Sequence, residues 1–187
     1  MLSAAEELIA ERGFAAASLA EIAEAAGVSK GAIYHHFRSK DDLLLALLDQ
    51  HFEERMRAVE PIAATPGAAA AERLVEEIPF DRRWNLLYLE FVVRAARDER
   101  FREELRGRLQ RLRKHGARGI EGYLEREGIR SELKPQQIAL ALAAVGNGLA
   151  IEGLTDPDTS TDPLYAYILG LLFEGMVARS QRDGRAT

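Results

Sequence analysis

Residues 18–40 read SLAEIAEAAGVSKGAIYHHFRSK, and this pattern predicts two short helices joined by a tight turn. Ser18 followed by Glu21 is a capping box, in which the serine oxygen and the glutamate satisfy backbone amides at the start of a helix. Ile22 lies with other apolar residues on one side of this helix at helical spacing. Gly27 stands where a left-handed residue can end a helix. The first helix is therefore expected to begin at Ser18 or Leu19 and to last about two turns.

The second helix of this stretch has an unusual outer face. Ser29 is placed to cap it, and its buried side carries Ile33 and Phe37, an i, i+4 pair. Gly31 and His35 then lie on the opposite side, facing outward. A glycine in an exposed helix interior costs about 1 kcal/mol relative to alanine. We therefore interpret Gly31 as a position where another molecule approaches the backbone closely.

The charge of the same segment indicates what that molecule is. Residues 29–40 include Lys30, Arg38, Lys40 and two histidines, and no acidic residue. A positive local field attracts the phosphate backbone of a nucleic acid. Two short helices with small and hydrogen-bonding residues on the outer face of the second form a helix-turn-helix, whose recognition helix enters the major groove. An ordinary helical hairpin is the alternative interpretation.

The motif also resembles that of a known family. Residues 27–44, GVSKGAIYHHFRSKDDLL, are similar to the DNA-binding signature of the TetR family of bacterial transcriptional regulators, and the similarity extends from Glu11 to Leu48. The resemblance matches Lys40 to a phosphate-contacting lysine of that family. It implies DNA contacts from residues of the recognition helix, namely Ser29, Lys30, Gly31, Ala32, Tyr34, His35 and His36.

Composition limits how such a protein can bind DNA. The net charge of −5 argues against indiscriminate nucleic-acid binding, so any DNA contact must be confined to the basic segment of the recognition helix. The chain has no cysteine, which excludes disulfides and thiolate metal sites. We see no apolar run long enough to span a membrane and no signal peptide. These features predict a cytoplasmic protein with no membrane partner.

Helical periodicity continues through the rest of the chain, and no strand-like alternation is present. A helix over residues 3–12 is expected to begin with a capping box of Ser3 and Glu6 and to end at Gly13. Later helices are predicted over about residues 39–60, 69–78, 82–98, 101–127, 135–154 and 164–179. The helix over residues 82–98 is apolar on most sides, which is typical of a helix buried among others.

The predicted fold is all-α, with about nine helices in the order that the family resemblance implies. A three-helix, helix-turn-helix DNA-binding head over residues 1–44 precedes a body over residues 45–187 that binds an effector and dimerises. The segment PIAATPGAAA, residues 61–70, is interpreted as a linker because it contains two prolines and a glycine.

The last two helices predict a partner. They carry more apolar surface than one small domain can cover, together with small residues that let another backbone approach. A second copy of the chain, packed as a four-helix bundle, is the expected partner. A core within one chain is the alternative. The resemblance points the same way, because TetR-family members dimerise through their last two long helices.

Four aromatic residues are candidates to line a cavity for a small, mostly apolar effector: Trp84, Tyr88, Phe91 and Tyr123. Asn85 or Glu90 is available to orient such a molecule. Core packing explains an aromatic stripe at helical spacing equally well. That the body binds an effector at all is implied mainly by the family resemblance.

The sequence does not indicate catalysis. His35 and His36 are adjacent on a helix, about 100° apart, and cannot ligate a metal together as an i, i+4 pair can. We found no glutamate–histidine helix motif and no glycine-rich phosphate loop. The sequence predicts no enzyme activity, no metal site and no cofactor.

A run of arginines and lysine in the helix over residues 101–127 has two interpretations. It comprises Arg106, Arg108, Arg111, Arg113, Lys114 and Arg118. It is either a second nucleic-acid patch or, as we favour, a solvated face paired in part with acids of the helix over residues 39–60. The arginines fall all round the helix and do not form one stripe, as a nucleic-acid patch would.

Together these features predict a homodimeric, ligand-responsive repressor that binds double-stranded operator DNA. The alternative function is a dimeric helical module that binds a small molecule or a partner and has a vestigial DNA-binding head. The acidic surroundings of the head favour that alternative. Members of the resembled family usually carry a basic arm before the first helix, and this chain, which starts close to that helix, is either a short version or has a trimmed start.

Overall fold

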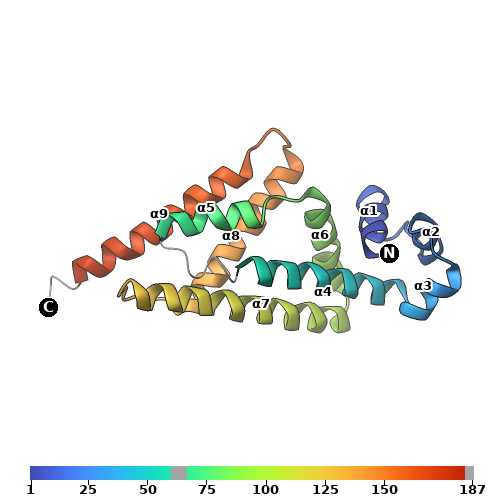
Figure 1. Ribbon diagram of the computed structural model, residues 1–187, viewed down its shortest axis with the longest axis horizontal. Helices are drawn as coiled ribbons and strands as arrows, with labels where there is room; N and C mark the ends of the chain where they lie inside the picture. The colour runs from blue at the N-terminus through green and yellow to red at the C-terminus, as the bar shows by residue number, and fades with distance from the viewer. Residues whose placement is uncertain (60–66, 184–187) are drawn as a thin grey trace. The chain divides into compact units, whose positions relative to one another are not determined.

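The computed structural model describes residues 1–59 and 67–183, and over these ranges the chain is all-α, as predicted. No strand occurs in these ranges (Figure 1). The helices are α1 (Leu2–Arg12), α2 (Leu19–Ala25), α3 (Lys30–His36), α4 (Lys40–Val59), α5 (Gly67–Glu77), α6 (Arg82–Arg97), α7 (Glu99–Arg126), α8 (Pro135–Thr155) and α9 (Thr161–Asp183).

Contacts between these helices divide the chain into two compact units. The first consists of Met1–Glu53 with Asp81–Arg108, and the second of Glu54–Phe80 with Leu109–Thr187. The first unit therefore includes α6 in addition to the helices of the predicted DNA-binding head. The functional boundary at residue 44 stays a prediction.

The helix-turn-helix forms by the local signals that the sequence contains. Ser18 Oγ accepts from the Glu21 amide at 3.2 Å while the Ser18 amide donates to Glu21 Oε2 at 2.9 Å, which confirms this capping box. The hydrogen bonds from Ser18 hold the pKa of the Glu21 carboxyl below its ordinary value. Gly27 has a φ of 66°, as expected at a helix end. Ser29 Oγ caps α3 by accepting from the Ala32 amide at 3.1 Å.

The start of α1 differs from the prediction. The helix begins at Leu2 with Met1 as its N-cap, so the predicted capping box of Ser3 and Glu6 is wrong. The Ala5 amide already donates to the Met1 carbonyl at 3.1 Å, which places Ser3 inside the helix. Gly13 ends α1 as predicted, with a φ of 79°.

The core of the first unit is formed by α4 and α6 with the inner faces of α1 to α3. Apolar side chains of α4 are buried along one face, including Leu43, Leu44, Leu47, Leu48 and Phe52. Asp81 caps α6 as predicted. The prediction that this helix is buried on most sides is wrong, because Val92 and Val93 are 39% and 47% exposed. Only the stripe of Trp84, Leu87, Phe91 and Ala95 is buried.

In the second unit, α5 packs along α9, and α8 also contacts α9. Ile120, Tyr123 and Leu124 of α7 form a buried cluster with Ile129 and Ile138, and Phe173 packs against it.

The helix α9 begins at Thr161, before the predicted start at Leu164, because Thr161, Asp162 and Pro163 form its first turn. The predicted linker falls partly on residues 60–66, outside the described residues, and α5 begins earlier than expected, at Gly67.

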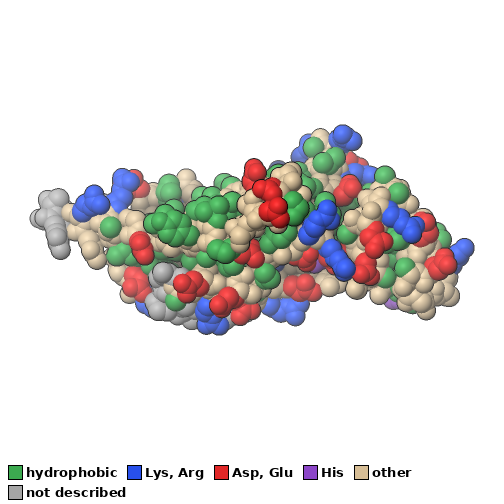
Figure 2. All heavy atoms as spheres, turned by 90° about the horizontal axis from the view of Figure 1, so that it is seen from above, with side chains coloured by type: hydrophobic (Ala, Val, Ile, Leu, Met, Phe, Trp, Pro, Cys, Tyr) green, Lys and Arg blue, Asp and Glu red, His purple; other side chains and the backbone are tan. Residues whose placement is uncertain are grey.

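The outer sides of α8 and α9 are strongly apolar. Exposed large side chains are Leu140, Val145, Ile151, Leu164, Tyr167, Leu171 and Leu172. Figure 2 shows apolar side chains gathered over this part of the second unit. By length and composition alone α8 could cross a membrane, contrary to our reading of the sequence, although a helix that packs against a partner has the same composition. Among the residues that the structure describes, none covers this apolar face of α8 and α9.

Gly27→Ala tests the turn between α2 and α3. A Cβ at Gly27 meets no atom within 4 Å, so its only cost is the left-handed backbone, about 1–2 kcal/mol of unfolding free energy. We expect chemical denaturation to show this loss. The matched control is Gly122→Ala in α7, which also meets nothing within 4 Å and should gain up to about 1 kcal/mol. Equal effects at both positions would contradict the role of Gly27.

Candidate nucleic-acid interface

The outer face of α3 lies open to solvent. Tyr34 is 54% exposed, and Ser29, Lys30, Gly31, His35 and His36 are also exposed. Ala32 is half-buried on the flank of the helix. The structure therefore places the residues predicted to contact DNA in α3, and the cap before it, together on one accessible surface. Their DNA contacts stay a prediction.

The inner face of α3 holds this surface in place. Ile33 is fully buried, Phe37 is half-buried, and α2 packs against α3. The rings of His35 and His36 meet edge to face, with centroids 5.6 Å apart. A seven-residue helix is too short to be stable alone in water, so its packing on α2 and its cap maintain it.

Gly31 has room for a side chain within the protein. An added Cβ would approach only Ser29 Oγ, at 3.8 Å, which is ordinary van der Waals contact. The φ of Gly31 is not positive either, so neither backbone conformation nor packing requires glycine here. No contact among the described residues therefore explains this glycine, and close approach by another molecule stays a prediction.

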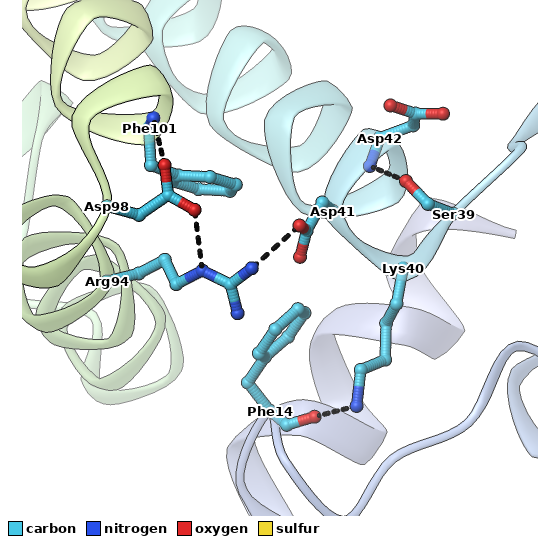
Figure 3. Close-up of polar contacts among 8 residues, drawn as sticks. All are labelled: Phe14, Ser39, Lys40, Asp41, Asp42, Arg94, Asp98 and Phe101. Atoms are coloured by element: carbon cyan, nitrogen blue, oxygen red, sulfur yellow. Dashed lines mark hydrogen bonds and ion pairs between the residues drawn. The ribbon is translucent and has the colours of Figure 1, made fainter.

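Lys40 differs from the other predicted DNA contacts. Its Nζ donates to the carbonyls of Phe14 at 2.6 Å and Ala15 at 3.0 Å, and it lies 4.6 Å from the centroid of the Phe14 ring. Figure 3 shows the side chain extending from the start of α4 toward Phe14. The ammonium group is therefore engaged by the turn that follows α1.

The four predicted effector-binding residues are divided between the two compact units, and their effector contacts stay a prediction. Trp84 and Tyr88 are neighbours in α6, with ring centroids 5.7 Å apart, and Phe91 stacks on Phe101 at 6.2 Å, all in the first unit. Tyr123 belongs to the second unit and meets Phe173 edge to face at 5.0 Å, and burial raises the pKa of its hydroxyl. Trp84, Phe91 and Tyr123 are buried, as core packing requires.

The structure shows specific contacts for two further residues. The sequence analysis did not select the first, and it considered the second only as a possible effector contact. Tyr165 in α9 donates to the Leu142 carbonyl at 3.1 Å, and burial raises the pKa of its hydroxyl to about 12. Glu90, which we considered as a group that orients an effector, instead accepts from the Phe14 amide at 3.3 Å. A single sequence gives no signal for either contact, because each joins residues far apart in the chain.

The arginine run of α7 is partly neutralised by acids. Arg108 pairs with Asp49 of α4 at 2.7 Å and with Glu104, and its hydrogen bond to Asp49 raises the pKa of the guanidinium. Arg106 pairs with Glu103 at 2.8 Å. These pairs support the predicted pairing with acids, whereas the Arg108 side chain is only 11% exposed and is therefore not solvated.

An exposed, capped α3 that packs on α2 across a glycine turn defines a helix-turn-helix DNA-binding protein. Residues 1–47 match the family profile described as bacterial regulatory proteins, tetR family, and residues 63–178 match BetI-type transcriptional repressor, C-terminal. The chain belongs to the TetR family of transcriptional regulators, as the resemblance implied.

Known proteins support this assignment. The HTH-type transcriptional regulator TtgR of Pseudomonas putida is 30% identical over 175 residues, which cover 92% of this chain and 76% of TtgR. The activator FasR of Mycolicibacterium smegmatis is 43% identical over 65 residues, 35% of this chain and 30% of FasR. A crystal structure of a TetR-family regulator from Rhodococcus sp. is 27% identical with a TM-score of 0.76, over 94% of this chain and 95% of that one.

Gly31→Ala tests the interface, because it should move stability and DNA binding in opposite directions. Alanine fits the space and favours the helix, so the unfolding free energy should rise by up to about 1 kcal/mol. Operator affinity should fall, because the added methyl group faces the DNA. Denaturation and a gel-shift titration measure the two effects. If the variant is more stable but its operator affinity is unchanged, DNA does not approach the backbone closely at Gly31.

Proposed function

We propose that this TetR-family regulator is a cytoplasmic, homodimeric repressor that releases its operator when an effector binds the C-terminal body. The single observation that supports DNA binding is the exposed outer face of α3, which carries small residues and Lys30. No packing contact among the described residues requires the glycine at position 31 of this face.

Different residues of α3 suit different parts of the duplex. Gly31 and Ala32 allow close approach, and Ala32 can contact a thymine methyl group. Lys30, Tyr34 and His35 suit phosphates or single hydrogen bonds. Apart from Lys30, none of these side chains belongs to the types that form bidentate pairs with bases. Much of the binding free energy is therefore expected to come from phosphate contacts and shape.

The apolar face of α8 and α9 supports dimerisation. In α9, Leu164, Tyr167 and Leu171 recur at helical spacing, so they form one stripe, and they are 42%, 64% and 51% exposed. In α8, Leu140 and Ile151 are exposed on one side with small residues between them. Apolar helix faces of this kind bury themselves against a second copy as a four-helix bundle.

Dimerisation provides a mechanism for effector control. Two recognition helices must reach successive major grooves about 34 Å apart. An effector that binds better to a dimer with another spacing shifts the population away from operator binding. The helix α4 belongs to both compact units, since residues 40–53 lie in the first and residues 54–59 in the second. It is therefore the element proposed to link body and head.

Tyr34→Ala and His35→Ala test the DNA contacts. Both side chains are exposed and neither supports the core, so each variant should fold and dimerise normally. We expect each to weaken operator binding by at least about 1 kcal/mol. The probe is the intergenic DNA beside the protein's own coding region, in a gel-shift titration. A variant with unchanged affinity would remove that residue from the interface.

Leu171→Glu tests the dimer. A charge in the centre of an apolar interface should give a monomer in sedimentation experiments and abolish operator binding. The matched control is Val93→Glu in α6, since Val93 is also an exposed apolar residue, at 47% against 51% for Leu171, but lies outside the apolar face. A Leu171→Glu protein that sediments as a dimer would show that the interface lies elsewhere.

The same DNA fragment separates the regulator from the alternative of a binding module with a vestigial head. Salt-sensitive retention of the fragment supports the regulator, because phosphate contacts weaken as salt rises. A dimer that retains no DNA even at low salt supports the binding module.

A further inference from the structure

The turn after α1 is held by polar groups from two other helices. Phe14 and Ala15 form this turn, which we call the Phe14 turn. The Phe14 amide donates to Glu90 Oε1 of α6 at 3.3 Å. The carbonyls of Phe14 and Ala15 accept from Lys40 Nζ, at the start of α4, at 2.6 and 3.0 Å (Figure 3). All of these residues belong to the first compact unit.

A second polar contact joins α6 to the start of α4. Arg94 of α6 pairs with Asp41, the neighbour of Lys40, at 2.8 Å. Arg94 also lies 3.9 Å from Asp98 and 5.3 Å from the centroid of the Phe101 ring, while Asp98 caps the Phe101 amide at 3.2 Å. Figure 3 shows Arg94 between Asp41 and Asp98. Its guanidinium is therefore fixed from several sides.

These contacts give the Lys40 ammonium a structural role. An ammonium group has three N–H donors, and two of them are used by the Phe14 turn. The charge also lies over the face of the Phe14 ring, a favourable cation–π position. Moving the ammonium to a phosphate would leave the two carbonyls without this partner, and unmade hydrogen bonds to charged groups are costly.

We propose that Lys40 is a positioning residue and not a phosphate ligand, and that it forms with Glu90, Arg94 and Asp41 a polar junction that sets how α3 is presented to DNA. The junction fixes the start of α4, which directly follows the recognition helix, against the end of α1. This proposal rests on the proposed DNA-binding function and assigns to Lys40 a role different from the one that the family resemblance implies.

The first test is the salt dependence of operator binding. Loss of a phosphate contact lowers the slope of log K against log salt by about 0.9 for each contact. The full-length protein with Lys40→Met should bind the intergenic DNA at least about fivefold more weakly, with an unchanged slope. The comparison variant is Lys30→Met, which removes an exposed lysine of α3 and should lower the slope. A reduced slope in Lys40→Met would overturn the proposal.

The second test asks whether neutralising an acidic residue of the junction strengthens or weakens DNA binding. Asp41→Asn and Glu90→Gln each remove a negative charge, which by long-range electrostatics alone should strengthen DNA binding. The junction predicts the opposite, a loss of about two- to fivefold for each, because a neutral amide oxygen accepts more weakly than the carboxylate that holds Arg94 or the Phe14 amide. Stronger or unchanged binding in both variants would overturn the proposal.

The matched control for Asp41 is its neighbour Asp42. Both acids lie in the first turn of α4, and Asp42→Asn removes the same charge. In Figure 3 the Asp42 carboxylate points away from Arg94, and the Asp42 amide donates to Ser39 Oγ at 3.0 Å. Asp42→Asn should therefore bind DNA as well as the parent protein or slightly better. A loss equal to that of Asp41→Asn would show that the effect belongs to the helix end and not to the junction.

A third measurement does not depend on DNA. Hydrogen exchange of the Phe14 amide in the full-length protein should accelerate in Glu90→Gln and Lys40→Met and stay unchanged in Asp42→Asn. Unchanged exchange in the first two variants would overturn the junction even where the protein binds DNA. If the parent protein retains no DNA but these exchange rates change as expected, the proposed function fails and the junction stands as a structural feature.

Discussion

The burial of Ile33 is the constraint on which the DNA-binding surface depends. Because Ile33 is fully buried beneath a seven-residue helix, the residues on the other side of α3 must face outward. The caps at Ser18 and Ser29 and the glycine turn at Gly27 fix where the two helices begin and end. A slip of one residue would turn the helix by about 100° and carry the interface away from solvent.

The first compact unit shows that the head does not fold on local signals alone. Its helices pack with α6, whose Glu90 and Arg94 contact the Phe14 turn and the start of α4. The DNA-binding surface is thus supported by a helix that is distant in sequence.

Prediction from sequence succeeded where the signal is local and failed where it is not. The caps at Ser18, Ser29 and Asp81 were correct because each joins residues two or three positions apart. The cap at Ser3 was wrong because the N-cap lies two residues earlier, at Met1, whose carbonyl accepts from the Ala5 amide. The exposure of Val92 and Val93 was missed because apolar periodicity predicts a buried face but not which neighbour, if any, covers it.

The amino-acid sequence by itself determined that this protein is helical, where the helix-turn-helix lies and which residues occupy its outer face. These follow from capping, periodicity and glycine placement, which act between residues a few positions apart. Only the tertiary structure decided that Lys40 and Glu90 meet at the Phe14 turn, and that Trp84 and Tyr123 belong to different units. The physical reason is that such side-chain contacts join residues far apart in the chain. They depend on how the helices pack and on which polar groups need partners, and local sequence patterns do not show either.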